Sequence, residues 1–334
     1  MGTGTGERSR RIPMLDAVRF AALCAVATQH AVFLSASSGV KASLAVLGCS
    51  ICAIPLLFAT SGYLSTLGGR SVELRRRVRR ILVPYAVWSV VLFGYGMQSE
   101  ARSGTLGTVL SSVSLTGVVL AGQAFYTLWF LAMLVYLTML GWAVRNDRGR
   151  VFGAIAALAV YAAISILRAT QPIMDTDTWG GFLIIAPLCV CSYFAGAALH
   201  KAPRVRSPAI TLAALILAVA ADAALYVLWG TELTQIQQFA ILTIGTVAAL
   251  LGLWTVAHST RADVLIRLAA IAGTFTLGIY TIHAPVLNVL RRLTGTREST
   301  DLVWALVLAV IATLVSLGAS YLMSRVRVLR PLVR

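Results

Sequence analysis

Ten long apolar segments, separated by short polar loops, constrain this chain more than any other feature. Most are about 20 residues long, which is the length a helix needs to cross the hydrocarbon core of a bilayer. Only 12% of the 334 residues are charged, whereas a soluble domain has roughly 25%. This excludes a soluble globular enzyme and a disordered chain. A backbone in lipid must satisfy its own hydrogen bonds, and these runs are continuously apolar rather than alternating, so we expect helices and not a β-barrel.

The sequence therefore predicts an all-α polytopic integral membrane protein with about ten spans in a single domain, 1–334. The third span is the shortest. The expected spans are 14–36, 42–66, 82–98, 121–144, 151–168, 181–200, 209–229, 236–257, 267–290 and 302–324.

Basic residues are distributed unevenly between the loops. Loops of one set, which includes both termini, hold 21 Lys and Arg, and the alternate loops hold 6. By the positive-inside rule both termini are expected in the cytoplasm. This explains the net charge of +16 without nucleic acid as a partner. Arg291, Arg292 and Arg297 are an exception on the expected outer side, either as tolerated loop charges or as contacts for an anionic acceptor.

The first span contains three ionisable residues, Asp16, Arg19 and His30, although charges within a span are costly and usually functional. Arg19 and His30 are 11 residues apart, which is three helical turns plus about 20° and roughly 16 Å along the axis. Asp16, three residues before Arg19, shares the same face and can pair with it. The pattern predicts an ion pair near the cytoplasmic edge and an imidazole deeper in the membrane on one helix face.

Several segments, taken in order, resemble the membrane acyltransferase-3 family. The similarity extends from residue 15 to residue 285, nearly the whole chain, and the family also has ten spans. Thr127 departs from the family pattern, because many members have histidine at this position. The matching segments are Leu15–Ala21 followed by His30, Phe58–Leu64, Arg76–Tyr85, Tyr126–Leu131 and Leu277–Pro285.

The resemblance implies transfer of an acyl group, most simply acetyl from acetyl-CoA, to a hydroxyl that is commonly on a sugar. A hydroxyl is a poor nucleophile and needs a positioned base, for which a neutral imidazole is suited. We expect His30 either to deprotonate the acceptor hydroxyl or to carry the acyl group itself; the sequence leaves both open.

Coenzyme A carries phosphates, which guanidinium groups bind well. We therefore expect Arg19 and the basic loop with Arg76, Arg79 and Arg80 to bind the donor at the cytoplasmic side. The distance from Arg19 to His30 is about the reach of an extended pantetheine arm. For part of this basic loop, membrane topology alone is an equal explanation.

Four further positions are candidates for substrate contacts. Tyr126 and Trp129 form either a sugar-stacking platform or an interfacial belt. Ser61, with Gly62 beside it, is interpreted first as a site of close helix packing. Asp222 is expected to face the cavity or to pair with an arginine.

His283 is the remaining candidate for the catalytic site. It precedes Pro285, which suggests a kink that faces the cavity. We interpret it as shaping the site rather than as the principal base.

The remaining expectations concern partners and location. The five cysteines lie in apolar segments and are interpreted as small buried hydrophobes, and no metal site is expected. The acceptor is a surface glycan, a glycolipid or a secreted glycosylated metabolite. An arginine-rich, lysine-poor composition indicates a GC-rich bacterial genome, and the expected location is the bacterial cytoplasmic membrane. The alternatives are a transporter or exporter of lipid or glycan, which lacks support from internal repeats, and a non-catalytic scaffold.

Overall fold

The computed structural model describes residues 12–33, 41–67, 72–103, 116–122, 124–125, 127–144, 146–170, 178–203, 207–230, 233–257, 264–295 and 301–334. Within these ranges the secondary structure is helical, without strands, so the predicted fold class is confirmed. The elements are α1 (Pro13–Phe33), α2 (Lys41–Ser50), α3 (Ala53–Thr66), α4 (Val72–Ser103), η2 (Gly117–Ala121), α6 (Trp129–Ala143), α7 (Asp147–Thr170), α8 (Thr178–Leu199), α9 (Pro208–Trp229), α10 (Gln235–Ala257), α11 (Val264–Gly273), α12 (Thr276–Leu293), α13 (Leu302–Arg325) and η4 (Arg330–Leu332).

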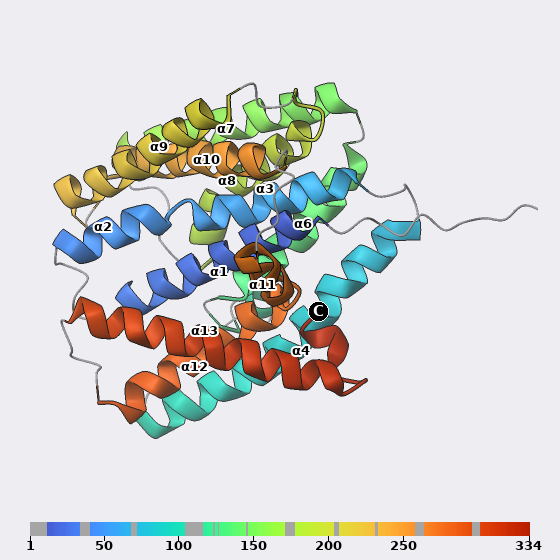
Figure 1. The fold of residues 1–334 in the computed structure, drawn as a ribbon, viewed down its shortest axis with the longest axis vertical. Coiled ribbons are helices and arrows are strands. Elements are labelled where there is room, and N and C mark those ends of the chain that lie inside the picture. Colours follow the sequence, from blue (N-terminus) through green and yellow to red (C-terminus); the bar gives the residue numbers. More distant parts are fainter. Residues whose placement is uncertain are drawn as a thin grey trace, which may run out of the picture.

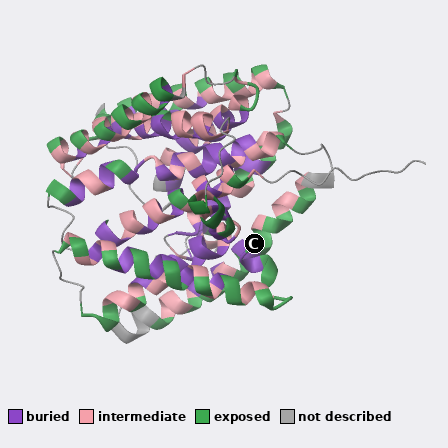
Figure 2. Cartoon of the chain, in the orientation of Figure 1, coloured by how far each residue is buried: buried purple, intermediate pink, exposed green. Residues whose placement is uncertain are grey.

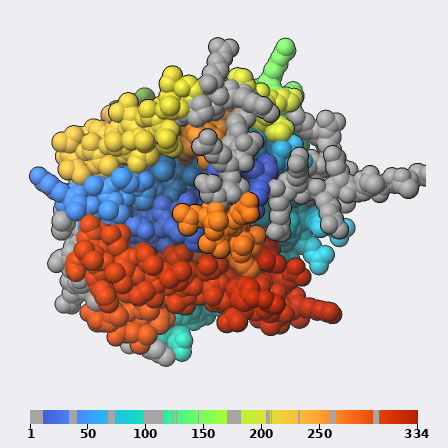
Figure 3. Space-filling model, in the orientation of Figure 1, coloured from blue at the N-terminus to red at the C-terminus, as the bar shows by residue number. Residues whose placement is uncertain are grey.

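Helix α1 lies at the centre of the bundle. It packs against α2, α3, α10, α11, α12 and α13. In Figure 1, α7, α9 and α10 lie on one side of α1, and α4, α12 and α13 lie on the other. In the space-filling view, α9 and α13 border this face of the molecule, with α1 and α2 between them (Figure 3). The first span predicted from the sequence is therefore the helix around which the others are arranged.

The outer helices present apolar side chains to their surroundings. Ile210, Leu217 and Leu228 on α9 are between 71% and 75% exposed, and exposed positions lie mainly on the outside of the bundle (Figure 2). An apolar surface of this extent requires lipid around it. The protein is a multi-pass membrane protein.

Within the described residues, seven spans are long and apolar enough to cross a membrane, one of them made of α2 and α3 together. Helices α11 and α12 add an eighth if they are counted as one bent span. Helix α1 is not among them because Asp16, Arg19 and His30 make it more polar, and α6 has only 15 residues. The expected number of ten stays a prediction.

Three expected spans have different boundaries in the structure. The third is too short in the prediction because α4 begins at Val72, so the basic tract is the first part of a helix and not a loop. Arginine is a good helix former, and hydropathy alone does not detect a helix that extends beyond the lipid. In the fourth, the regular α-helix begins at Trp129, after the short π-helical η2 and a turn.

The ninth expected span is two helices. Helices α11 and α12 meet at an angle of 76°, with the break at Thr274–Phe275. The sequence predicts a kink at Pro285, but α12 is one helix through Pro285, and the sharp bend precedes it. A proline removes only its own backbone N–H donor, so the other backbone hydrogen bonds of α12 can still form.

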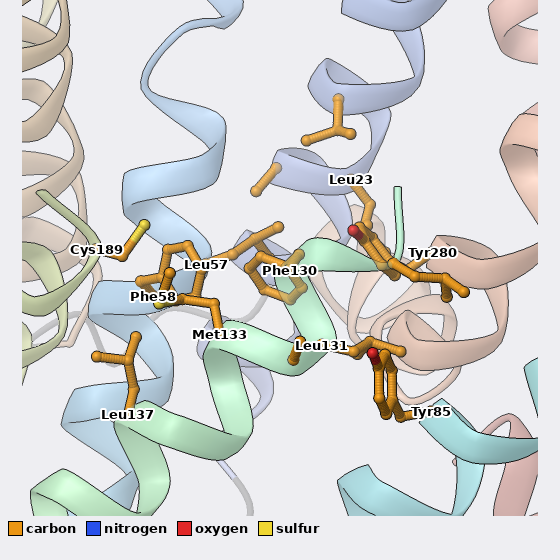
Figure 4. Packing of buried hydrophobic residues seen from close by; sticks show 14 of the residues in the cluster. Leu23, Leu57, Phe58, Tyr85, Phe130, Leu131, Met133, Leu137, Cys189 and Tyr280 are labelled. Atoms are coloured by element: carbon orange, nitrogen blue, oxygen red, sulfur yellow. The ribbon is translucent and has the colours of Figure 1, made fainter. Parts of the chain in front are cut away.

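The main core joins α1, α3, α4, α6, α8 and α12. Its aromatic centre consists of Phe58, Phe130 and Tyr280, shown in Figure 4. The ring centroids of Phe58 and Phe130 are 4.6 Å apart, and those of Phe130 and Tyr280 are 5.0 Å apart. This cluster connects α3 and α6 to α12, the helix that carries His283.

Helices α3 and α8 approach closely at two glycines. A Cβ atom at Gly62 would lie 1.9 Å from the Tyr193 carbonyl oxygen, and one at Gly196 would lie 2.1 Å from the Ala59 carbonyl oxygen. Small residues allow such backbone contact between membrane helices. The packing interpretation of the Ser61-Gly62 segment agrees with this contact.

Candidate functional site

Two histidines from distant parts of the sequence meet in the structure. His30, near the end of α1, stacks on His283 of α12 with ring centroids 5.4 Å apart and an interplanar angle of 27°. His283 is buried, with 1% of its surface exposed, and His30 is half-buried. The sequence predicted each residue separately as a site residue, and the structure places them in direct contact.

The hydrogen bonding of His283 assigns its tautomer. Nδ1 lies 3.1 Å from the Ile279 carbonyl oxygen, which only accepts, so Nδ1 carries the proton. In a neutral imidazole Nε2 then has the lone pair. Nε2 is buried and has no hydrogen-bond partner among the described residues. His283 therefore holds a buried imidazole nitrogen with a free lone pair, next to the ring of His30.

Tyr280 fixes α12 beside this pair. Its hydroxyl donates to the backbone carbonyl of Thr127, and its ring lies 5.9 Å from that of His283. Thr127 is buried, and its own hydroxyl has no partner among the described residues. The position that many family members fill with histidine thus adjoins the tyrosine that packs against His283.

A charged group lies at the other end of α1. Arg19 Nη1 is 3.9 Å from Asp16 Oδ1, which agrees with the predicted pairing. Arg80 of α4 is close enough for its charge to act on Arg19. Arg19 Nε is buried and has no hydrogen-bond partner within the described residues. Among the described residues, Asp16 is the carboxylate that acts on these two cations. Two cations beside one carboxylate, together with an unused donor, are suited to an anionic ligand.

The basic tract extends this cationic region along α4. Arg76, Arg79 and Arg80 are exposed, and their spacing of three and four residues places them on one helix face. Arg77 is oriented differently, since its Nη1 donates to the Ser65 carbonyl oxygen at 3.0 Å. It thereby fixes α4 to the end of α3.

Helix α1 is continuous over Pro13–Phe33, so Arg19 and His30 share a face as expected and are separated by roughly 16 Å along the axis. The charged end of α1 also adjoins the α11–α12 bend. A Cβ atom at Gly273, the last residue of α11, would lie 2.0 Å from the Asp16 carbonyl oxygen. One helix thus connects the cationic region to the histidine pair.

The predicted substrate residues are dispersed. Ser61 donates to the Leu57 carbonyl oxygen within its own helix. Trp129 packs on the core, with its ring 6.3 Å from that of Phe58. Tyr126 lies outside the described residues.

Asp222 lies in a different part of the bundle from the histidine pair. It is 0% exposed, and neither carboxylate oxygen has a partner among the described residues. It lies on α9, which packs against α2 and α10, and Oδ2 is 3.2 Å from where a Cβ of Gly245 would be. The structure does not bring it beside His30 and His283.

Two features of the site were missed from the sequence. Tyr280 belongs to a recognised segment, and its spacing of three residues from His283 places both on one helix face; this signal was available. The contact of Gly273 with α1 has no local sequence signal, because it depends on how two distant segments pack.

Comparison with protein-family models finds a match over most of the chain. The acyltransferase-3 family model, described as an acyltransferase domain, matches residues 12–325. No curated protein matches, and no solved structure matches. The matched range includes both histidines and the cationic region. The chain therefore belongs to the acyltransferase-3 family of membrane acyltransferases.

Proposed function

We propose that this acyltransferase moves an acetyl or other short acyl group from cytoplasmic acyl-CoA to a hydroxyl of a sugar-bearing acceptor. The observation that carries the proposal is the arrangement on α1: a cationic end at Arg19 and a stacked histidine pair at His30 and His283. Coenzyme A fits this arrangement, because its phosphates can bind at the cationic end of α1 while its long arm carries the thioester to the histidine pair.

In the proposed reaction, Arg19, Arg80 and the exposed arginines of α4 hold the phosphates of coenzyme A. His30 removes the proton from the acceptor hydroxyl, whose oxygen attacks the thioester carbon. The new carbon–oxygen bond forms, the carbon–sulfur bond breaks, and the proton passes from His30 to the departing thiolate. His283 holds the ring of His30 in place by stacking, with its own Nδ1 fixed by the Ile279 carbonyl.

We propose that the cationic end faces the cytoplasm. The starts of α1 and α4 and the end of the chain lie at the same end of the bundle (Figure 1). The basic tract of α4 lies at this end, and the positive-inside rule places such a tract in the cytoplasm. The site for coenzyme A is then on the side where coenzyme A occurs.

Acetyl-CoA binding to the full chain in nanodiscs tests the donor side without knowledge of the acceptor. We expect saturable binding to the wild type and about tenfold to 100-fold weaker binding to Arg19→Ala, because a charge-assisted hydrogen bond contributes roughly 1.5–3 kcal/mol. Isothermal titration calorimetry provides the measurement.

Arg168→Ala is the matched control, since Arg168 is also an arginine at a helix end and donates to Gln235 Oε1 at 2.7 Å. Its binding should stay within twofold of the wild type. Absence of binding to folded wild type, or equal weakening in both variants, would contradict the proposed donor site.

A further inference from the structure

A lateral groove lies between α4, α12 and α13. Its volume is about 400 Å³, within the range of roughly 300–1,000 Å³ typical of ligand pockets. Val91 of α4 and Val315 of α13 line it and are 50% and 47% exposed. Because such exposed positions face lipid in this bundle, the groove opens laterally toward the membrane.

The lining of the groove is suited to a hydrocarbon chain. All ten lining residues are aliphatic or aromatic. The indole nitrogen of Trp88 is already used, since it donates to the Leu332 carbonyl oxygen at 3.2 Å. The Tyr95 hydroxyl is buried and has no partner among the described residues. A free sugar or a charged metabolite would find almost no hydrogen-bonding groups on these walls.

One wall of the groove is the helix that carries His283. Ile282, Val286 and Val289 line the groove from α12, while the adjacent residue His283 contacts α1. A molecule held in the groove is therefore separated from the histidine pair by the thickness of one helix.

Cationic residues lie at one end of the groove. Arg291 and Arg292 occupy the last turn of α12, at the opposite end of the bundle from Arg19. Arg292 follows Pro285 by seven residues and Val289 by three, which places it on the groove side of the helix, one turn beyond Val289. These two arginines belong to the cluster on the expected outer side that departs from the positive-inside pattern. They belong neither to the proposed donor site nor to the histidine pair.

We propose that this groove binds a phosphate-bearing lipid whose head group carries the acceptor hydroxyl. Its hydrocarbon chain lies between α4, α12 and α13, and Arg291 and Arg292 hold its phosphate. The combination of an apolar channel with two cations at one end is complementary to an anionic lipid. The proposal of a lipid-binding site is supported by the groove and its two arginines alone. The lipid's role as acceptor rests, in addition, on the function proposed above.

The position of the arginines also restricts the head group. Arg292 is nine residues from His283 on α12, or about 13 Å along the axis. The acylated hydroxyl therefore lies well away from the phosphate, which selects an extended saccharide head group over a simple phosphate head group.

Photocrosslinking of the full chain in phosphatidylcholine nanodiscs tests the binding site. The probes are a diazirine-bearing polyprenyl phosphate and the uncharged polyprenol of equal length. Mass spectrometry should locate the phosphate probe on α4 and α12. Val91→Trp should lower this labelling at least fivefold by filling the groove, whereas Val160→Trp, at a lipid-facing valine that is 49% exposed, should stay within twofold.

Arg292→Gln provides a second variant at an exposed position. We expect it to lower labelling by the polyprenyl phosphate about fivefold, the effect of one basic residue on an anionic lipid, and to leave polyprenol labelling unchanged. Equal labelling by both probes, or equal effects of Val91→Trp and Val160→Trp, would show nonspecific boundary lipid and overturn the proposal.

The acceptor role is tested by incubating membranes of the source organism with radiolabelled acetyl-CoA. Label that depends on this protein should enter the lipid extract and fall with Val91→Trp; label only in water-soluble material would overturn the acceptor role.

The donor site and the groove can be contradicted independently of each other. Loss of acetyl-CoA binding with intact phosphate-dependent crosslinking contradicts the donor site, and the reverse result contradicts the groove.

Discussion

Replacing His30 with glutamine should lower acyl transfer by a factor of about 100 to 10,000, the usual contribution of a positioned acid–base group. Glutamine retains a polar side chain of similar length but accepts no proton near neutral pH. Because Arg19 is roughly 16 Å away, acetyl-CoA binding should stay within twofold of the wild type. Transfer of radiolabel from acetyl-CoA, measured beside the thermal midpoint of unfolding, checks this result.

His200→Gln is the control for this substitution, since His200 is exposed and contacts Tyr63 edge-on away from the pair. Its transfer rate should not change. Full activity of His30→Gln would remove His30 from the mechanism. A second test omits the acceptor and denatures the protein after incubation with radiolabelled acetyl-CoA. If label stays bound to the wild type but not to His30→Gln, then His30 carries the acyl group as an acyl-histidine intermediate and is not a base.

The part of this site that is local in sequence could be predicted from the sequence. Arg19 and His30 share a face because the helical period fixes their relation within one continuous helix. The ion pair with Asp16 follows from the same period. The dense packing at Gly62 was also accessible, because a small residue inside an apolar span typically marks a place where two helices approach closely.

The part that depends on contacts between distant segments could not be predicted. The stacking of His30 on His283 joins residues separated by most of the chain, and no pattern in either helix specifies the other. The bend at Thr274–Phe275 lies within one continuous apolar run, so hydropathy gave a single span. Asp222 also could not be placed from the sequence. Its charge within an apolar span indicated a function, but its neighbours depend on the packing of α9 against α2 and α10.

Another long-range contact, the one between Gly273 and α1, yields the second large expected effect. Gly273→Ala should destabilise the protein by about 1–3 kcal/mol or more, because overpacking at this level is costly. The added Cβ atom would lie 2.0 Å from the carbonyl oxygen and 2.5 Å from the carbonyl carbon of Asp16. These are backbone atoms, so no side-chain rotation relieves the overlap, and α11 must move away from α1.

That movement affects both ends of the proposed reaction, because the Asp16–Arg19 pair lies on one side of the contact and the α11–α12 bend that positions His283 lies on the other. We expect weaker acetyl-CoA binding together with a kcat about 100-fold lower, since a displacement of about 1 Å at a reacting group is sufficient for such a loss.

Gly318→Ala on α13 is the matched control, as a Cβ there has no neighbour within 4 Å. It should preserve activity and raise stability by up to about 1 kcal/mol through helix propensity. Thermal unfolding and steady-state kinetics on both variants separate the cases. If Gly273→Ala behaves like Gly318→Ala, then α11 does not pack on Asp16 as described, and α1 does not couple the donor end to the histidine pair through this contact.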